Sequence, residues 1–169
     1  MGRVRHLIAA ATLLLPFSAL AQPTPPHTGH TAPAAPANPP PTAAPADARV
    51  YFIAPVNGAR IRGPFVVQFG LRGMGVTQAG VTTANTGHHH LLVDVKTPLD
   101  PLEPIPADKN HIHFGGGQTE TRLDLPPGRH TLQLVLGDSL HRPFQPSVAS
   151  ERIEIIVLRP TPKKKRRRG

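Results

Sequence analysis

The sequence predicts an all-β fold, an immunoglobulin-like antiparallel β-sandwich, with a small β-barrel as the alternative. Three observations favour this fold class. Between residues 48 and 159, apolar residues alternate with polar ones at the two-residue period of a strand. Turns rich in Pro and Gly separate these runs, and no stretch there has a convincing helical period. The span of 159 − 48 + 1 = 112 residues is close to the roughly 100 residues of one such domain.

The predicted strands are short and follow one another along this span. In Phe65–Leu71, where the alternation is clearest, every second residue is apolar and one face of the strand is expected to be buried. We expect six or seven strands in all, the clearest being Val50–Ile53, Phe65–Leu71, His88–Val95, Thr119–Leu125, His130–Leu136 and Ile153–Val157. The longer segments between them are expected to be loops: Val76–Thr86, Lys96–Asn110 and Ser139–Ser150.

Both ends of the chain are expected to lie outside the domain. Residues 1–21 have the basic start, the short apolar stretch and the Ala-x-Ala end of a secretory signal peptide, which predicts a periplasmic or secreted protein. Residues 22–47 are almost all Pro, Ala, Thr and His and are expected to form a disordered tether. The β-domain over 48–159 is then followed by a disordered basic tail over 160–169. No stretch of the mature chain is long and apolar enough to predict a transmembrane segment.

The positive charge of the chain is concentrated at its two ends. Of the 19 Lys and Arg residues, two lie in the leader and six form Lys163–Arg168, which leaves 19 − 8 = 11 against 10 acidic residues. A polybasic tail on an exported chain predicts contact with an anionic envelope surface, and nothing in the neutral middle predicts specific nucleic-acid binding. The chain has no Cys, which excludes disulfides, thiolate metal sites and Cys nucleophiles.

Five of the ten histidines lie in two short runs, His88–His90 and His111–His113. Residues two apart on a strand point the same way, with Cα atoms about 6.5–7 Å apart, so each run can offer a pair of imidazoles to one ion. The candidate metal ligands are His88, His90, His111, His113 and, from a later loop, His141. Asp94 is in phase with the first pair and is a candidate to orient one of the rings from behind. Since the ligand set holds no Cys, it favours Zn(II) or Cu(II).

Two further histidines are expected to have structural roles. His89 shares its strand face with Leu91 and Val93, which predicts a partly buried ring on the core side. His130 follows a Pro-Gly turn at a corner where immunoglobulin-like folds often place a Tyr that ties down the backbone. We expect His130 to make the same kind of tie.

Three classes of function remain open at this point. The first is an exported, non-catalytic domain that binds a divalent transition metal through its clustered histidines. The alternative is a cell-envelope interaction or adhesion module, held on an anionic surface by its basic tail, in which the histidines are structural or respond to pH. The third is a hydrolase with a histidine-bound metal. The chain lacks a serine nucleophile elbow, a P-loop and a dinucleotide fingerprint, so a non-catalytic role is favoured.

The segments Thr86–Asp94, Asn110–Glu120 and Leu125–Leu132, with the motifs GHHHLL and HIHFGGGQTE, resemble a domain-of-unknown-function family of small exported bacterial proteins. The resemblance covers nearly all of the region from His88 to Val157. It implies an exported β-domain with a histidine signature, and it implies no established activity. In that family a second polar residue, often His, follows the Pro after the His141 position, whereas this chain has Phe144 there.

Overall fold

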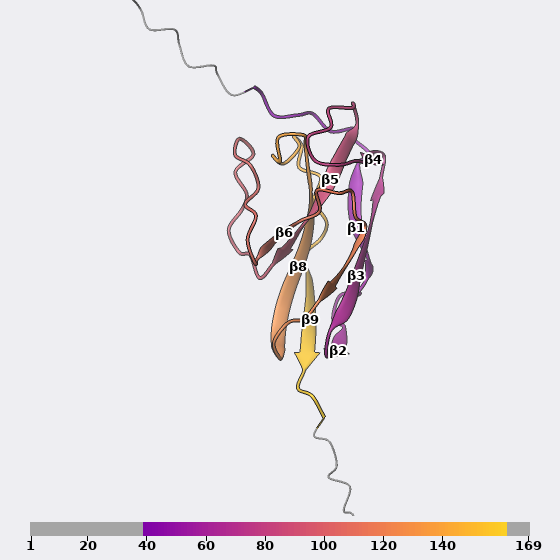
Figure 1. The fold of residues 1–169 in the computed structure, drawn as a ribbon, viewed down its shortest axis with the longest axis vertical. Coiled ribbons are helices and arrows are strands. Elements are labelled where there is room, and N and C mark those ends of the chain that lie inside the picture. The colour runs from indigo at the N-terminus through magenta and orange to yellow at the C-terminus, as the bar shows by residue number, and fades with distance from the viewer. Residues whose placement is uncertain (1–38, 162–169) are drawn as a thin grey trace, which may run out of the picture. The chain divides into compact units, whose positions relative to one another are not determined.

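The structure of the protein is a computed structural model that describes residues 39–161. Over these residues the fold is all-β and contains no helix, as the sequence predicts (Figure 1). The strands are β1 (Arg49–Ala54), β2 (Arg60–Arg62), β3 (Phe65–Arg72), β4 (Gly75–Val76), β5 (Thr86–Val93), β6 (His111–His113), β7 (Glu120–Leu123), β8 (Gly128–Gly137) and β9 (Ile153–Leu158). The predicted signal peptide, most of the tether and the basic run Lys163–Arg168 lie outside the described residues.

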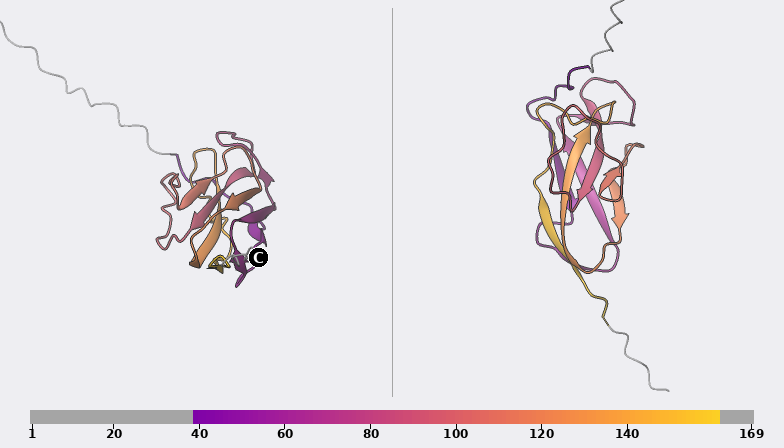
Figure 2. Two further views of the ribbon diagram at one scale, coloured as in Figure 1. Left: turned by 60° about the horizontal axis from the view of Figure 1, so that its bottom comes forward. Right: turned by 90° about the vertical axis from the view of Figure 1, so that its left-hand side faces the viewer.

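The strands form two facing sheets, which confirms the predicted sandwich (Figure 2). One sheet is antiparallel and has the order β1-β3-β7. The other has the order β2-β9-β8-β5-β4, and β6 also pairs with β5. Its three central strands are antiparallel, while β2 and β4 join it as short parallel strands. Between residues 39 and 161, no helix has the length and hydropathy needed to cross a membrane.

The core lies between the sheets and is built by the alternation that the sequence shows. In β3, Phe65, Val67 and Phe69 are buried, and the residues between them on the strand are exposed. The facing sheet contributes every second residue of three strands: Leu91 and Val93 of β5, Leu132, Leu134 and Leu136 of β8, and Ile153, Ile155 and Val157 of β9. Burial of these side chains is the main source of stability of such a domain.

Three short strands were not expected from the sequence. β2, β4 and β6 have only two or three residues each, too few for a two-residue period to be visible. β4 falls at the start of the expected loop Val76–Thr86. β5 also ends earlier than expected, at Val93 rather than Val95, because Asp94 has a φ of 57° and turns the chain out of the sheet.

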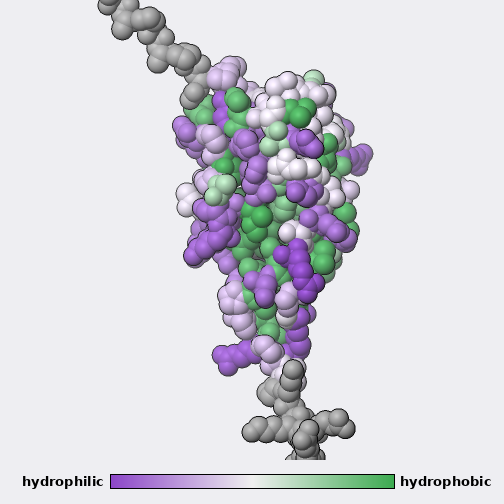
Figure 3. All heavy atoms as spheres, in the orientation of Figure 1, coloured by the Kyte–Doolittle hydropathy of each residue, from purple (hydrophilic) through white to green (hydrophobic). Residues whose placement is uncertain are grey.

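The outer face of β5 is buried as well, which the alternation does not predict. All residues from Gly87 to Val93 are buried. Part of the cover is the loop after β5, where Ile105 joins Leu92 and Val135 in a second, smaller apolar cluster. Elsewhere the surface mixes polar side chains with scattered apolar ones (Figure 3). The central strand is therefore enclosed on both sides, and polar groups on its outer face are removed from solvent.

Residues upstream of Ala48, the expected first residue of the β-domain, already contact the domain. Residues 39–47 belong to the expected tether, yet Thr42 and Ala44 make backbone hydrogen bonds with Gln145. These contacts attach the last part of the tether segment to the loop that follows β8. The predicted tether therefore contributes to the packed domain over its last residues.

Candidate metal centre

β5 separates its three consecutive histidines onto two faces. His88 and His90 lie on the outer face with ring centroids 4.9 Å apart. His89 lies on the core face, where its ring centroid is 4.8 Å from that of Phe69. All three side chains are at most 1% exposed. As the alternation along the strand predicts, His88 and His90 share one face of β5, and His89 lies on the other face, in the core.

The pairing of β6 with β5 brings a third imidazole to the outer face. In this antiparallel register His113 lies directly opposite His90. Residues directly opposite one another point to the same face of a sheet. As a result the ring centroid of His113 is 5.0 Å from the centroids of both His88 and His90.

The fourth imidazole comes from the loop that follows β8. His141 has a φ of 65°, and its ring lies against His88 of β5. Its ring centroid lies 4.9 Å from that of His88 and 4.8 Å from that of His113. The ring of His90 is farther away, at 6.3 Å. Segments distant in the sequence therefore converge on one point.

Three of these four rings form a group that can hold a metal ion. One nitrogen each of His88, His113 and His141 lies within 4.8 Å of the others. Zn–N bonds of about 2.0–2.1 Å place the nitrogens of a tetrahedral site roughly 3.4 Å apart, so shifts of about 1 Å per ring close the triad around an ion. His90 is the adjacent fourth ring, with its Nε2 atom 3.1 Å from Nε2 of His88.

Two glycines make the space that the rings occupy. Gly137 of β8 pairs with His88, and a Cβ atom at this position would lie 2.8 Å from Nε2 of His90. A Cβ atom at Gly115 would lie 2.5 Å from Cε1 of His113. Neither contact is sterically possible without displacement of a ring. The cluster thus depends on residues without a side chain at both positions.

Three of the clustered histidines have lowered pKa values, which favours their neutral form: His88, His90 and His113. Burial, together with the nearby His141 and His113, lowers the pKa of His88 to about 4. Burial and the adjacent His88 lower the pKa of His90 to about 3. Burial, followed by His141, also lowers the pKa of His113. Neutral imidazole is the form that binds metal, so these rings need not lose a proton at neutral pH.

Several ring nitrogens of the cluster have no hydrogen-bond partner among the described residues. These atoms are buried and are Nδ1 of His88, Nδ1 of His90 and Nε2 of His113. A buried polar atom without a partner costs free energy comparable to a lost hydrogen bond. A coordinate bond to a metal ion satisfies such a nitrogen. An unpaired nitrogen that faces the ion would thus gain a partner on metal binding, whereas both ring nitrogens of His89, on the core face, are unpaired as well.

The structure places His111, a predicted ligand, outside the group formed by His88, His113 and His141. The register of β6 places His111 opposite Leu92, two residue pairs farther from His88 than His113 is. Its Nδ1 atom lies 2.9 Å from Oδ1 of Asp108, which occupies that nitrogen. The i, i+2 spacing of His111 and His113 correctly predicted that both lie on one face of β6. The register between β6 and β5 determines which of the two reaches His88 and His90.

The structure places the carboxylate of Asp94 at His130 and Thr131, away from the clustered rings that it was predicted to orient. Since the backbone turns at Asp94, its carboxylate leaves the face of His88 and His90. It instead contacts His130, with Oδ2 2.8 Å from the Nδ1 atom of the ring, and accepts the Thr131 N–H through Oδ1. On the other side of the ring, Nε2 donates to the carbonyl of Pro126 at 2.8 Å. His130 therefore ties down its corner, as the sequence predicts.

The sequence reasoning missed the residues that support the rings. Gly115 follows the HIHF motif in a run of three glycines, and Gly137 ends a strand, so both resemble ordinary turn residues in the sequence. Asp138, which follows that strand, is 2% exposed and bonds the loop that carries His141. The sequence offered one signal, the position of Gly115 two residues after His113, whereas the contact of Gly137 with His88 depends on the sheet register.

The comparisons with known proteins give a family and no activity. Residues 67–158, more than half of the chain, match the family model described as "Domain of unknown function (DUF4399)". No curated protein matches the chain. Among solved structures, the chain is similar to the X-ray structure of the endo-beta-1,4-mannanase from Thermotoga petrophila, with 18% sequence identity and a TM-score of 0.41. That similarity covers 68% of this chain and 20% of the mannanase chain, so this chain spans about a fifth of that protein's length.

Proposed function

Since this chain belongs to the DUF4399 family, a domain family of unknown function, we propose its function from the geometry of its histidine cluster: the domain binds a divalent transition metal. The ligands are His88, His113 and His141, with His90 available as a fourth nitrogen. The observation that carries the proposal is the convergence of three imidazole nitrogens within 4.8 Å of one another.

The identity of the metal follows from the donor atoms. The cluster offers only imidazole nitrogens, which suit Zn(II), Cu(II) and Ni(II), and it offers no thiolate or thioether for soft Cu(I). Zn(II) and Cu(II) are the ions we propose. A site of three or four imidazoles on a buried strand is suited to holding or carrying an ion, and the proposal includes no catalytic step.

Protons compete less with a metal at those histidines of the cluster whose pKa is lowered. A histidine with an ordinary pKa of about 6.5 becomes protonated in mildly acidic solution and loses its metal. Here burial and the neighbouring rings lower the pKa of His88 to about 4 and that of His90 to about 3. We therefore expect protons to compete less with a metal at His88 than at an exposed histidine.

Calorimetric titration of the protein with Zn(II) and with Cu(II) tests the proposal. The expected result is one ion per chain with a micromolar or lower Kd. Replacing a ligand, His113→Ala, is expected to weaken binding at least about tenfold. His113 is preferred to His88 for this variant because it is partly exposed, so its replacement disturbs the core less.

The matched control is His111→Ala. It removes the same kind of side chain from the same short strand, two residues away, outside the cluster. Its metal affinity should equal that of the wild type. Equal losses in the two variants would show that the affinity belongs to histidines in general, and a wild type without affinity for either ion would refute the proposed function.

A further inference from the structure

The loop that presents His141 is organised by a buried carboxylate. Asp138 is 2% exposed, and its Oδ1 atom accepts the backbone N–H groups of Leu140 and Arg142, each at 2.9 Å. The Asp138 N–H closes the loop by donating to the carbonyl of Arg142 at 2.9 Å. His141 lies between these two bonded residues, so its position in the cluster depends on how this carboxylate is held.

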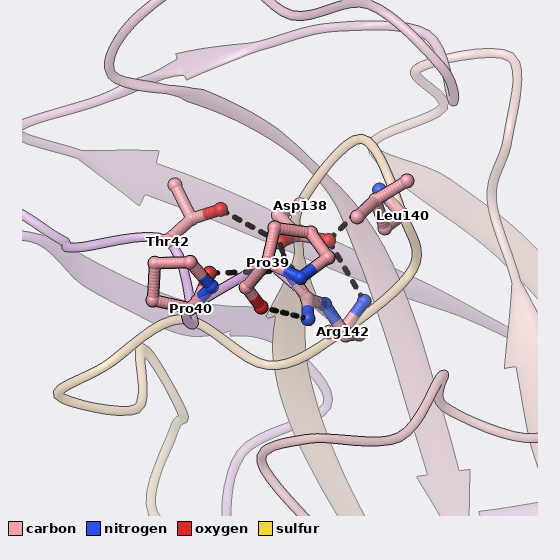
Figure 4. Close-up of polar contacts among 6 residues, drawn as sticks. All are labelled: Pro39, Pro40, Thr42, Asp138, Leu140 and Arg142. Atoms are coloured by element: carbon pink, nitrogen blue, oxygen red, sulfur yellow. Dashed lines mark hydrogen bonds and ion pairs between the residues drawn. The ribbon is translucent and has the colours of Figure 1, made fainter. Parts of the chain in front are cut away.

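The other oxygen of that carboxylate is held from a distant part of the chain. Oγ1 of Thr42 donates to Oδ2 of Asp138 at 2.7 Å (Figure 4). The guanidinium of Arg142 donates to the carbonyl of Pro39 at 2.8 Å and to that of Pro40 at 3.3 Å. Figure 4 shows these contacts converging on Asp138 and Arg142 from the segment that precedes the first strand.

Backbone hydrogen bonds extend the same contact. The Gln145 N–H donates to the carbonyl of Thr42 at 2.9 Å, and the Ala44 N–H donates to the carbonyl of Gln145 at 3.2 Å. We call residues Pro39–Ala44 the strap. The strap thus lies along the loop that carries His141 and contacts it through both side chains and backbone.

These contacts involve two charged side chains, Asp138 and Arg142, that are buried and therefore not hydrated. The side chains of Asp138 and Arg142 are 2% and 5% exposed, with Oδ2 and Nη2 3.6 Å apart. A buried charge without enough hydrogen bonds is costly, so the donor from Thr42 and the acceptors of Pro39 and Pro40 are part of what keeps the loop folded. The left-handed backbone of His141 also persists only where its surroundings hold it in place.

We propose that the strap positions His141 for metal binding and is coupled to the bound ion. The inference rests on the proposed function, because it assigns a role in the same site to residues that do not contact the metal. A docked strap raises the affinity for the metal, and by reciprocity a bound metal strengthens the docking of the strap.

Thr42 offers the mildest way to loosen the strap. Thr42→Val keeps the shape of the side chain and removes the hydroxyl that donates to Asp138, whereas Thr42→Ser keeps the hydroxyl. Calorimetric titration with Zn(II) should give an affinity about tenfold weaker for Thr42→Val, as expected for loss of a hydrogen bond to a charged group, and a near wild-type affinity for Thr42→Ser. Thr82→Val, at an exposed threonine outside the strap, is the control and should not change the affinity.

A double-mutant cycle with His141→Ala separates positioning from general destabilisation. If the strap acts through His141, adding Thr42→Val to His141→Ala should not weaken the residual affinity further. Metal should also slow amide hydrogen exchange at Ala44 and Gln145 in the wild type but not in His141→Ala.

Wild-type affinity in Thr42→Val, or an equal loss in the His141→Ala background, would overturn the inference and leave the proposed function standing. A wild type that binds neither Zn(II) nor Cu(II) would instead refute the proposed function, and the inference with it.

Discussion

His141 is the one clustered histidine with an unfavourable backbone conformation. Its φ of 65° lies in the left-handed region, which is uncommon for all residues except Gly; Asn, Asp and His enter it more often than the others, and Asn does so with help from local hydrogen bonds of its short side chain. The loop would therefore accept Asn more readily, but Asn lacks an imidazole. The presence of a strained histidine whose ring reaches His88 and His113 is consistent with a role in binding rather than in folding.

This conflict between stability and binding can be measured by comparing two variants. His141→Asn and His141→Ala both remove the imidazole, but only Asn relieves the backbone strain. We expect the Asn variant to unfold at a higher urea concentration than the Ala variant, by about 1 kcal/mol, with weak metal binding in both. Equal stabilities would show that the backbone at this position is not strained.

Gly137 is expected to be as important to the cluster as a ligand. A Cβ atom there would lie 2.8 Å from Nε2 of His90, which is closer than two non-bonded atoms can approach. The ring of His90 is buried and has little room to move away. Gly137→Ala should therefore lower the free energy of unfolding by about 1–3 kcal/mol and weaken metal binding.

Gly116→Ala is the matched control for that substitution. Gly116 is exposed, and its added Cβ would meet only the flexible side chain of Gln118. Its free energy of unfolding should change by no more than about 0.5 kcal/mol. Urea unfolding and metal titration of both variants give the comparison, and an unaffected Gly137→Ala would mean that the rings adjust at no cost.

At the scale of elements, His130 ties the start of β8 to two other segments. Burial by itself would lower the pKa of His130, but the hydrogen bond to Asp94, the Pro126 carbonyl and the charge of Asp94 outweigh burial and raise it. A group with a raised folded-state pKa stabilises the protein fully below its unfolded pKa of about 6.5 and loses that contribution as the pH rises through the folded pKa. The corner should therefore be most stable in mildly acidic solution.

Asp94→Asn removes the charge that causes this shift. Urea unfolding of the wild type and the variant at about pH 6 and about pH 9 should show a larger stability difference at the lower pH. The carboxylate of Asp94 is partly exposed, so high salt should reduce the difference. A difference that grows with rising pH would contradict a protonated His130.

The alternation in β5 was sufficient to predict which histidines share a face, because side-chain direction on a strand depends only on the local backbone. It was not sufficient to choose between His111 and His113. That choice depends on the register between β5 and β6, which is fixed by contacts far apart in the sequence. The position of the Asp94 side chain could not be predicted for a related reason. Its positive φ ends the strand, and an alternation of apolar and polar residues gives no information on a backbone angle.

At the scale of the whole molecule, the predicted order of segments extends beyond the described residues. The signal peptide, the upstream tether and the basic tail remain predictions from the sequence. We propose that the protein is exported and that Lys163–Arg168 holds it on an anionic envelope surface. This role is independent of the metal, because the tail and the histidine cluster are separate parts of the sequence.

Deleting Lys163–Arg168 tests the proposed role of the tail. The deletion should abolish salt-sensitive retention on envelope fractions, since six positive charges supply the attraction and salt screens it. Affinity for Zn(II) should not change, which serves as the internal control. Retention of the truncated protein at the wild-type level would show that another part of the chain makes the contact.

The His-x-His spacing of β6 has a consequence for how this strand finds its place. A one-residue slip would turn Ile112 toward the rings, but a two-residue slip would present His111 where His113 now lies, so the imidazoles alone cannot distinguish the two alignments. Phe114 can: its N–H donates to the carbonyl of His89, and its buried ring packs against Phe69. The alignment of the cluster is thus specified by an aromatic anchor that never contacts the ion.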